Sequence, residues 1–446
     1  MPSVLIHTLG CKLNQLESEA ITSAFLHSGF ALADSSGDPS VIVINTCTVT
    51  SKADQKARRV IRKALRDYPG SCVIVTGCYA QLNGADIQNI EGGGGRLFVL
   101  DGQGKENILS VPSFFDENAD FRAAFKELGQ ADVIQDTAGV FQFFPERFSS
   151  HTRSFLKIQD GCDKRCTYCR IRLARGPAVS LAAREALARL RILEKNHSEA
   201  VLTGVNICQY YDEKTAPGLG RLLEYLLAGT EKIYLRLSSL APETIDEDFA
   251  RILSAKRIRP HFHLSVQSGS KKILEKMGRS YNAQTVERAA SLLRRAKDDP
   301  FLACDIIAGF PGETKADFEE TLDLCKKLDF AWIHVFPYSK RPGTPAWSFP
   351  GAVREGEVTK RVEILSDLAR QGRAAYVNRW IGREVDVLAE KGGGSNSCRG
   401  LSENYLKLLV QYKGEKAPPP GTVLRCKIVE GEVHAEGYYD AVAVCS

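Results

Sequence analysis

The sequence lacks any apolar run near the length of a membrane span, which requires about 20 consecutive apolar residues. Its first residues, Met1 to His7, lack the basic region and apolar core that mark a signal peptide. It also lacks a strong charge imbalance, because 59 Lys and Arg face 54 Asp and Glu. We therefore predict a cytoplasmic protein without membrane contacts. Its net charge of +5 permits a nucleic-acid partner without requiring one.

The rest of the composition is that of an ordinary globular protein. Hydrophobic residues make up 43% and charged residues 25% of the 446 positions, and the length allows two or three domains with their own cores. The thirteen cysteines are an odd number for a chain of this size. Without a secretion signal, they favour reduced thiols and metal ligation over disulfides.

Three cysteines with the spacing C-x3-C-x2-C, Cys162, Cys166 and Cys169, follow an apolar strand expected at 154–160. No fourth Cys or His lies close behind them, and the next cysteine is Cys208. Zinc sites usually pair two Cys-x2-Cys units or add histidines, so zinc and unrelated thiols are the weaker alternatives. Three soft thiolates suit an iron–sulfur cluster that has one iron open to another ligand.

A second set of three cysteines lies in the first hundred residues. Apolar runs at 4–9, 41–45 and 72–76 predict parallel strands buried on both faces, and each run leads into a cysteine: Cys11, Cys47 and Cys78. The carboxyl ends of parallel strands meet at one edge, and helix N-termini there favour thiolates. We infer a second cluster with three thiolate ligands. The alternative is that all are core cysteines, as we expect for Cys72. The remaining cysteines are interpreted as structural: Cys208, Cys304, Cys325, Cys398, Cys426 and Cys445.

The central part of the chain alternates strands and helices. The expected strands are 154–160, 199–206, 232–239, 261–267, 301–309 and 331–338, with helices between them such as 181–196 and 315–328. Six such units are too few to close an eight-stranded barrel, so we predict an open, partial (β/α)6 barrel. Active sites of such folds lie at the carboxyl ends of the strands. Turns of the kind that approach a cofactor fall at these ends, at 203–206, 267–269 and 309–314.

Two further segments bear on RNA binding. The segment 52–66 holds seven Lys and Arg against one Asp on a predicted helix, which suits phosphate contacts or, equally, a solvated helix face. Residues 381–446 show short strands between Gly- and Pro-rich turns, as expected for a small all-β barrel. Their eight basic and nine acidic residues give no support for RNA binding.

Over nearly its whole length the chain resembles the radical SAM methylthiotransferase family. The resemblance is carried by both cysteine sets and by the segments 202–206, 266–270, 309–314 and 337–344, and residues 381–446 resemble a TRAM domain. It implies two 4Fe-4S clusters and S-adenosyl-L-methionine (SAM), which binds the open iron of the C-x3-C-x2-C cluster and is cleaved to a 5′-deoxyadenosyl radical. Family members replace C–H by C–SCH3 on a tRNA adenosine or a ribosomal-protein aspartate.

The resemblance also assigns roles to single residues. It places Tyr168 near the SAM adenine, with Thr203, Gly204 and Asn206 where the methionine amino group binds and Gln267 and Ser268 near the ribose. The implied partners are the anticodon stem-loop of tRNA, an electron donor such as flavodoxin or ferredoxin, and a sulfur donor. One departure is the stretch 170–176, which keeps Arg175-Gly176 but lacks the proline usual in the family.

The residues around Cys11 indicate the substrate. The stretch 8–19, with Gly10-Cys11-Lys12-Leu13-Asn14-Gln15, resembles the bacterial group that acts on threonylcarbamoyl-adenosine. The group acting on isopentenyl-adenosine tends to have Gly-Cys-Gln-Met-Asn there, and the ribosomal-protein group Gly-Cys-Pro-Lys-Asn. Those two substrates are the alternatives, with a non-catalytic iron–sulfur sensor that binds RNA as a third. For Asn14 itself, capping of the following helix is the simplest expectation.

These inferences define a domain plan. We predict an N-terminal parallel α/β domain (1–115), a Phe-rich connecting segment (116–150), a radical SAM core (151–350), a linker helix (351–380) and a TRAM-like β domain (381–446). The fold class is α/β with a small C-terminal all-β barrel.

Overall fold

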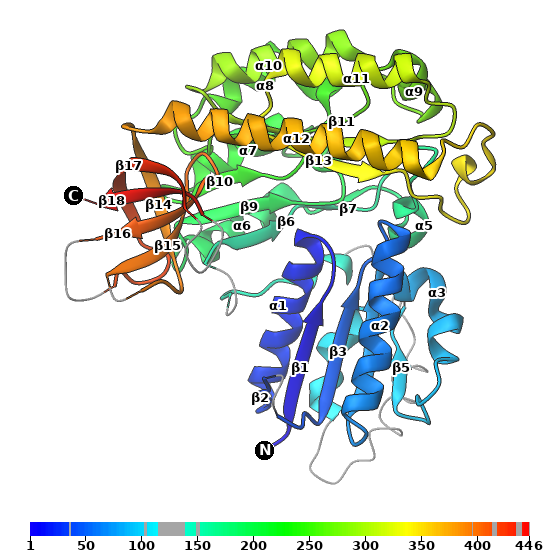
Figure 1. Ribbon diagram of the computed structural model, residues 1–446. Coiled ribbons are helices and arrows are strands. Elements are labelled where there is room, and N and C mark those ends of the chain that lie inside the picture. The colour runs from blue at the N-terminus through cyan, green and yellow to red at the C-terminus, as the bar shows by residue number, and fades with distance from the viewer. Residues whose placement is uncertain are drawn as a thin grey trace.

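The structure is a computed structural model that describes residues 1–34, 37–101, 105–114, 139–148, 152–394, 396–412, 417–433 and 439–445. Figure 1 shows a parallel-sheet part at the N-terminus, a larger central core and a small barrel that ends the chain. Most of the connecting segment predicted at 116–150 lies outside the described residues. No described helix combines the length and apolar character needed to cross a membrane.

The N-terminal part is a five-stranded parallel sheet in the order β2-β1-β3-β4-β5. Its strands are β1 (Ser3–Thr8), β2 (Ala31–Leu32), β3 (Val41–Thr46), β4 (Cys72–Gly77) and β5 (Leu97–Val99), and its helices are α1 (Lys12–His27), α2 (Ser51–Asp67) and α3 (Cys78–Gln88). Every residue of β3 and β4 is buried, because α1 covers one face of the sheet and α2 and α3 cover the other. Because both faces of β3 and β4 are covered, both strands are continuous apolar runs in the sequence.

The central core contains two three-stranded parallel sheets, β10-β9-β6 and β11-β12-β13, joined by a parallel bridge between Leu240 and Leu264. The strands are β6 (Ser154–Lys157), β9 (Glu199–Thr203), β10 (Tyr234–Leu237), β11 (His261–Gln267), β12 (Phe301–Ala308) and β13 (Trp332–Pro337). The helices are α5 (Ile171–Arg175), α6 (Ala183–Glu194), α7 (Leu219–Gly229), α8 (Glu247–Leu253), α9 (Lys271–Lys276), α10 (Ala283–Ala296) and α11 (Lys315–Leu328). No pairing between β6 and β13 closes the described strands, so the open six-stranded barrel is confirmed.

One predicted strand is divided. The run expected at 154–160 ends as β6 at Lys157, and β7 (Gln159–Asp160) pairs antiparallel with β8 (Val179–Ser180). The return strand β8 comes only after the C-x3-C-x2-C loop, so this pairing ties the two ends of the loop together. The loop is therefore closed at its base by a short two-stranded sheet.

The long helix α12 (Glu355–Trp380) leads from the core into a closed barrel in the order β14-β15-β16-β18-β17. Its strands are β14 (Glu384–Glu390), β15 (Ser397–Ser402), β16 (Lys407–Gln411), β17 (Val423–Val433) and β18 (Tyr439–Cys445). Cys426 and Cys445 stand opposite each other in the β17–β18 register and form a disulfide. This pairing corrects the expectation of reduced thiols throughout; the other eleven cysteines are free.

A buried ion network fixes the barrel to the core. Arg236 donates to Glu199 at 2.7 and 3.0 Å, and Arg259 donates to the same carboxylate at 3.0 Å. Arg236 also donates to the carbonyl oxygens of Ser402 and Glu403 in the barrel. Burial opposes ionisation of Glu199, but the two arginines outweigh it and hold its pKa at about 2.

Removal of the Glu199 charge should destabilise this contact. Glu199→Gln leaves two buried guanidinium groups without a carboxylate, a change that typically costs about 3–5 kcal/mol. We expect a lower urea midpoint of unfolding at pH 7 and a smaller difference as the pH falls from 4.5 towards 2, where wild-type Glu199 also loses its charge. Glu224→Gln, which breaks an exposed pair with Arg221, is the control and should cost less than about 1 kcal/mol. Equal midpoints for the two variants at pH 7 would contradict the assignment.

Candidate functional site

The C-x3-C-x2-C loop is held by its own backbone. Cys162 N donates to Gly176 O at 3.1 Å, which joins the start of the loop to its end. Cys169 N donates to Cys166 O at 3.1 Å and keeps the second and third thiols on one turn. The amide of Ile171 lies 3.5 Å from Cys169 Sγ, where it stabilises a thiolate. Local geometry thus brings together the three cysteines that the spacing singled out.

The second set of cysteines meets at one edge of the N-terminal sheet. Cys11 is the N-cap of α1, Cys47 follows β3, and Cys78 is the first residue of α3. Gly10, at φ +108°, approaches so closely that a Cβ there would lie 2.5 Å from Cys47 Cβ. Gly77, at φ +95°, has the same close approach to the backbone of β3. These two positions require glycine because the strand ends are pressed together around the thiols.

The thiols of each set influence one another. Burial raises the pKa of Cys47 to about 12, and Cys11 and Cys78 add to the rise. Burial likewise raises the pKa of Cys169 to about 11, with a contribution from Cys166. Such thiols resist ionisation unless a cation compensates, and a bound metal deprotonates its thiol ligands. The donor sets therefore fit a cationic metal cluster.

Neither set forms a compact site for a metal ion. Among the described residues, no group of three or more His, Cys, Asp or Glu side chains is arranged to hold one. Thiolates that ligate an iron–sulfur cluster bind separate iron atoms, and so they stand farther apart than the ligands of a single ion.

Asn14 has a different role from the predicted helix cap. The N-cap of α1 is Cys11, and no side chain caps this helix. Instead, Asn14 Nδ2 donates to Leu9 O at 2.7 Å and to Thr46 O at 2.9 Å. The buried amide thereby ties the ends of β1 and β3 together. The expectation was wrong because Asn14 lies one turn inside the helix and faces the neighbouring strand end.

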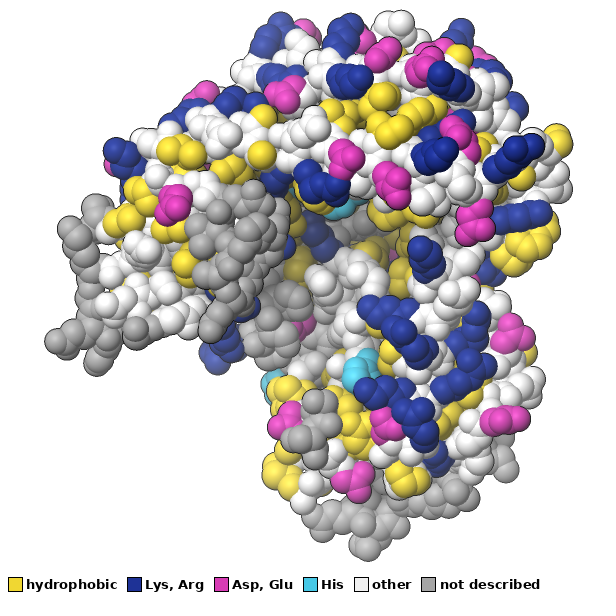
Figure 2. Space-filling view, in the orientation of Figure 1, with side chains coloured by type: hydrophobic (Ala, Val, Ile, Leu, Met, Phe, Trp, Pro, Cys, Tyr) yellow, Lys and Arg dark blue, Asp and Glu magenta, His cyan; other side chains and the backbone are white. Residues whose placement is uncertain are grey.

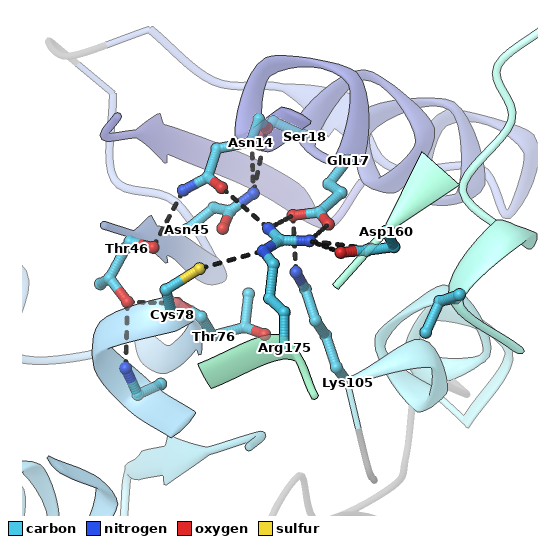
Figure 3. Close-up of polar contacts among 12 residues, drawn as sticks. Asn14, Glu17, Ser18, Asn45, Thr46, Thr76, Cys78, Lys105, Asp160 and Arg175 are labelled. Carbon is cyan, nitrogen blue, oxygen red and sulfur yellow. Dashed lines mark hydrogen bonds and ion pairs between the residues drawn. The ribbon is translucent and has the colours of Figure 1, made fainter. Parts of the chain in front are cut away.

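Arg175 connects the two sets of cysteines. It follows the C-x3-C-x2-C loop, and its Nε donates to Sγ of Cys78 in the N-terminal sheet at 3.2 Å. Its Nη1 lies 3.1 Å from Glu17 and 3.0 Å from Asp160, and its Nη2 donates to Asn14 at 3.3 Å (Figure 3). The guanidinium is buried, with 7% of the side chain exposed.

Two lysines complete this charge network. Lys105 Nζ lies 2.6 Å from Glu17 Oε2, and Lys157 pairs with Asp160. Burial favours protonation of Glu17, but Arg175 and the lysines outweigh it and lower its pKa to about 2. The same cations hold the pKa of Asp160 well below its usual range. Both carboxylates are therefore charged at neutral pH, and the network crosses the interface between the N-terminal sheet and the core.

A cavity of about 310 Å³ adjoins this network. Its lining includes Glu17, Cys78, Lys105, Asp160 and Arg175, so it opens beside one thiol of the second set. Its lining also includes apolar residues, among them Leu100, Val140 and Phe143, so the cavity is of mixed character.

A second contact joins the same two parts of the chain. Arg341, from the segment 337–344, donates to the hydroxyl of Thr48 at 2.6 Å and to its carbonyl at 3.0 Å. It also pairs with Asp54 at 2.7 Å, and Ser51 N donates to Ser339 Oγ at 3.0 Å. Thr48 directly follows the second cysteine of the N-terminal set, so this contact holds that strand end against the core.

The predicted SAM-binding residues of β9 lie beside the C-x3-C-x2-C loop. Asn206 Nδ2 is 4.0 Å from Cys162 Sγ, and Asn206 N donates to Gln159 Oε1 at 2.8 Å. Gly204 packs so closely that a Cβ would lie 2.8 Å from Gln159 O. Thr203 is buried at the end of the strand. The structure brings these three residues together at the mouth of the partial barrel.

Gln267 ends β11 in a strained conformation, and Ser268 follows it. Gln267 has φ +69°, in the left-handed region, and the pairing of β11 with β12 is irregular there. The Ser268 hydroxyl is buried and lies 3.1 Å from Thr321 Oγ1 on α11. Because that hydroxyl is already hydrogen-bonded within the protein, a ribose contact for Ser268 stays a prediction.

Tyr168 lies within the cluster loop, between Cys166 and Cys169, and packs against an apolar group. Its ring packs edge-on against Phe310, with centroids 6.3 Å apart, and Arg279 donates to its hydroxyl at 2.5 Å. Sequence reasoning missed Arg279, although it follows a short helix and a glycine beside a predicted cofactor turn. It also missed Glu17 and Asp160, for which no motif gave a signal.

Comparisons with known proteins agree with this organisation. Residues 3–94 match the uncharacterized protein family UPF0004, and residues 156–325 match the radical SAM superfamily. The fold of the chain is similar to that of TsrM from Kitasatospora setae, a radical S-adenosylmethionine methyltransferase. The TM-score is 0.53 at 15% identity, covering 77% of this chain and 74% of that chain.

Relatives with assigned names are similar over the full length. The chain is 38% identical to the threonylcarbamoyladenosine tRNA methylthiotransferase MtaB of Treponema pallidum, covering 98% of this chain and 99% of that protein. It is 33% identical to the protein of that name from Thermotoga maritima, covering 98% and 100%. It is also 32% identical to a tRNA-2-methylthio-N(6)-dimethylallyladenosine synthase of Maricaulis maris, covering 87% of each. With two cysteine sets at the strand ends of two matching domains, the chain is an enzyme that belongs to the radical SAM methylthiotransferase family.

Proposed function

We propose that the protein converts threonylcarbamoyl-adenosine next to the tRNA anticodon into its 2-methylthio derivative. The observation that carries the proposal is that two three-cysteine sets, each at the carboxyl ends of a parallel sheet, are joined across one interface by Arg175. Five relatives at 32–38% identity, including those of Treponema pallidum and Thermotoga maritima, carry the threonylcarbamoyladenosine name. The expectation from the stretch 8–19 is the same.

The cysteines are assigned as ligands of two 4Fe-4S clusters. Cys162, Cys166 and Cys169 hold the cluster that binds SAM, and Cys11, Cys47 and Cys78 hold the second. When bound, these groups supply a carbon radical from SAM and the sulfur of the methylthio group. The protein contributes thiolates and the amide and guanidinium hydrogen bonds to their sulfurs.

The SAM assignments rest on the arrangement around the first cluster loop. Thr203, Gly204 and Asn206 converge beside Cys162 and are proposed to receive the methionine end. Tyr168 and Gln267 are assigned to the adenosine end, and Ser268 supports the turn that carries Gln267. A backbone that approaches closely at Gly204 leaves room for a ligand on its open side.

The basic helix is the proposed tRNA contact. The segment 52–66 forms α2 as predicted, and six of its seven basic residues are exposed, all except the half-buried Arg58. Figure 2 shows their side chains gathered over this helix on one face of the molecule. Among the residues that the structure describes, Arg66 alone of the six makes an ion pair, with Asp67, so the face retains positive charge for phosphates of the anticodon stem-loop. Flavodoxin or ferredoxin as electron donor, a sulfur donor and a cytoplasmic location belong to the same proposal.

Nucleoside mass spectrometry tests the substrate directly. In tRNA from a strain without this gene, the 2-methylthio form of threonylcarbamoyl-adenosine should disappear, and it should return with the gene. Loss of the dimethylallyl derivative instead would support the second candidate, which the Maricaulis maris relative favours. If no tRNA nucleoside changes, the tRNA assignment is wrong.

Iron analysis tests the second set of ligands. Cys78→Ala should lose about half of the iron of the anaerobically reconstituted protein and all methylthiolation, because one 4Fe-4S cluster loses a ligand. Cys72→Ala is the matched control: it is a buried thiol of the same strand, at the end away from the cysteine set, and should keep full iron content. A Cys78→Ala protein that still methylthiolates would refute the two-cluster scheme.

Arg175 should raise the reduction potential of the second cluster. Hydrogen bonds to cluster sulfurs and nearby positive charge raise a cluster's reduction potential. We expect Arg175→Gln to make the reduction potential of the N-terminal cluster more negative than in the wild type. Arg175→Lys keeps the charge and should therefore give a smaller shift. Redox titration followed by electron paramagnetic resonance measures it, with the C-x3-C-x2-C cluster of each protein as internal reference. An unchanged potential in Arg175→Gln would contradict the assignment.

A further inference from the structure

The inner wall of the partial barrel carries polar side chains that neither cluster uses. His263 in β11 and Asp305 in β12 are half-buried, and His334 in β13 is exposed. Asp305 and His334 are directly paired across β12 and β13. Alternate residues of a strand share a face, so these side chains lie on the face of the sheet that solvent reaches. The face drawn in Figure 2 is hollowed between the core, the barrel and the N-terminal part.

These residues are in contact with one another. Ser239 Oγ lies 2.9 Å from His263 Nδ1, and His263 Nε2 lies 3.1 Å from Asp305 Oδ1. The rings of His263 and His334 are 5.1 Å apart, and Trp332 Nε1 donates to His334 Nδ1 at 3.3 Å. We call Ser239, His263, Asp305 and His334 the inner-wall cluster. It presents hydroxyl, imidazole and carboxylate groups side by side, in a fold whose inner faces are usually filled by apolar side chains.

The depth of the cluster suits part of a substrate. Asp305 and His334 lie three residues before the ends of their strands, and His263 lies four before the end of β11. At about 3.3 Å per residue this is roughly 10–13 Å below the mouth where the cluster loop stands. A base at the mouth could therefore extend a substituent down to this wall.

Lys12 provides a positive charge towards the same space. It is the first residue of α1, directly after Cys11, and belongs to the stretch whose sequence distinguishes the substrate groups. Burial lowers the pKa of His334, and His263 and Lys12 add to the fall. Burial raises the pKa of Tyr405 in the C-terminal barrel, but Lys12 and nearby arginines outweigh it and lower this pKa. Within the part of the chain that the structure describes, the Lys12 ammonium makes no hydrogen bond and no ion pair. An ammonium partly withdrawn from water is stabilised by an anionic partner.

The chemistry of the proposed substrate supplies that anion. A threonylcarbamoyl group carries a carboxylate, a hydroxyl and amide-type N–H and C=O groups, whereas a dimethylallyl group carries none of these. We propose that Lys12 binds the carboxylate of the threonylcarbamoyl group and that the inner-wall cluster binds its hydroxyl and amide groups, which makes this the specificity site. The inference rests on the proposed function. A dimethylallyl group would leave these polar groups unpaired, which is how such sites reject an analogue.

Binding of chemically matched stem-loops tests the site. The probes are anticodon stem-loops carrying threonylcarbamoyl-adenosine or its neutral threonine-amide analogue, bound to the reconstituted full-length protein under anaerobic conditions. The wild type should bind the carboxylate form about tenfold more tightly, the size of one charge-assisted hydrogen bond. In Lys12→Gln this preference should fall to less than about twofold, through weaker binding of the carboxylate form alone. Lys315→Gln, an exposed surface lysine, should keep the wild-type ratio.

Because Lys12 directly follows Cys11, its substitution could disturb the second cluster, so a second variant is needed that leaves this segment unchanged. His334 lies away from both cysteine sets, and His334→Ala should reduce the affinity for both modified stem-loops relative to an unmodified one, with unchanged iron content. If Lys12→Gln keeps the tenfold preference, or if His334→Ala binds all three stem-loops as the wild type does, the specificity site is wrong. If the wild type methylthiolates the dimethylallyl stem-loop and not the threonylcarbamoyl one, the proposed function fails instead.

Discussion

The buried Arg175 network is the constraint on which the site depends. Arg175, Lys105 and Lys157 bring three positive charges into the interface, and Glu17 and Asp160 bring two negative ones. Arg175, which pairs with both of these carboxylates, also donates to Cys78 Sγ. Buried charges persist only when they are paired. The same guanidinium therefore serves both the docking of the two parts and the second set of cysteines.

In both the N-terminal part and the core, the carboxyl ends of parallel strands gather functional residues at one edge of a sheet. The strand ends of the N-terminal sheet gather three cysteines that are distant in sequence, and glycines at 10 and 77 allow their backbones to meet. The core places its three cysteines on one loop and surrounds that loop with the ends of β9 and β11. Arg175 and Arg341 then hold the two edges together from opposite sides of the second set. Two separate ligand edges thus become one reaction space.

Much of this was predictable from local sequence. The apolar runs predicted the buried strands β3 and β4, the segment 315–328 forms α11 with the predicted limits, and the spacing of Cys162, Cys166 and Cys169 predicted a single ligand loop. The failures concern contacts between distant residues. Asn14 looked like a helix cap, but its partner Thr46 lies 32 positions away. The Arg175 pairs span up to 161 positions, and the disulfide depends on the register of β17 and β18. Residue type and spacing do not encode such pairings.

The C-terminal barrel contributes to the reaction space as well as to any RNA contact. Arg236, held by Glu199 inside the core, donates to the carbonyls of residues 402 and 403 and so fixes the turn that carries Tyr405. The Tyr405 ring lies 4.0 Å from that of His261, at the start of β11, and closes the end of the inner wall away from the clusters. Burial would raise the pKa of Tyr405, but nearby cations led by Lys12 outweigh this and lower it. The barrel and the core therefore meet at Tyr405, and a change in barrel docking would alter the space that the substrate side chain enters.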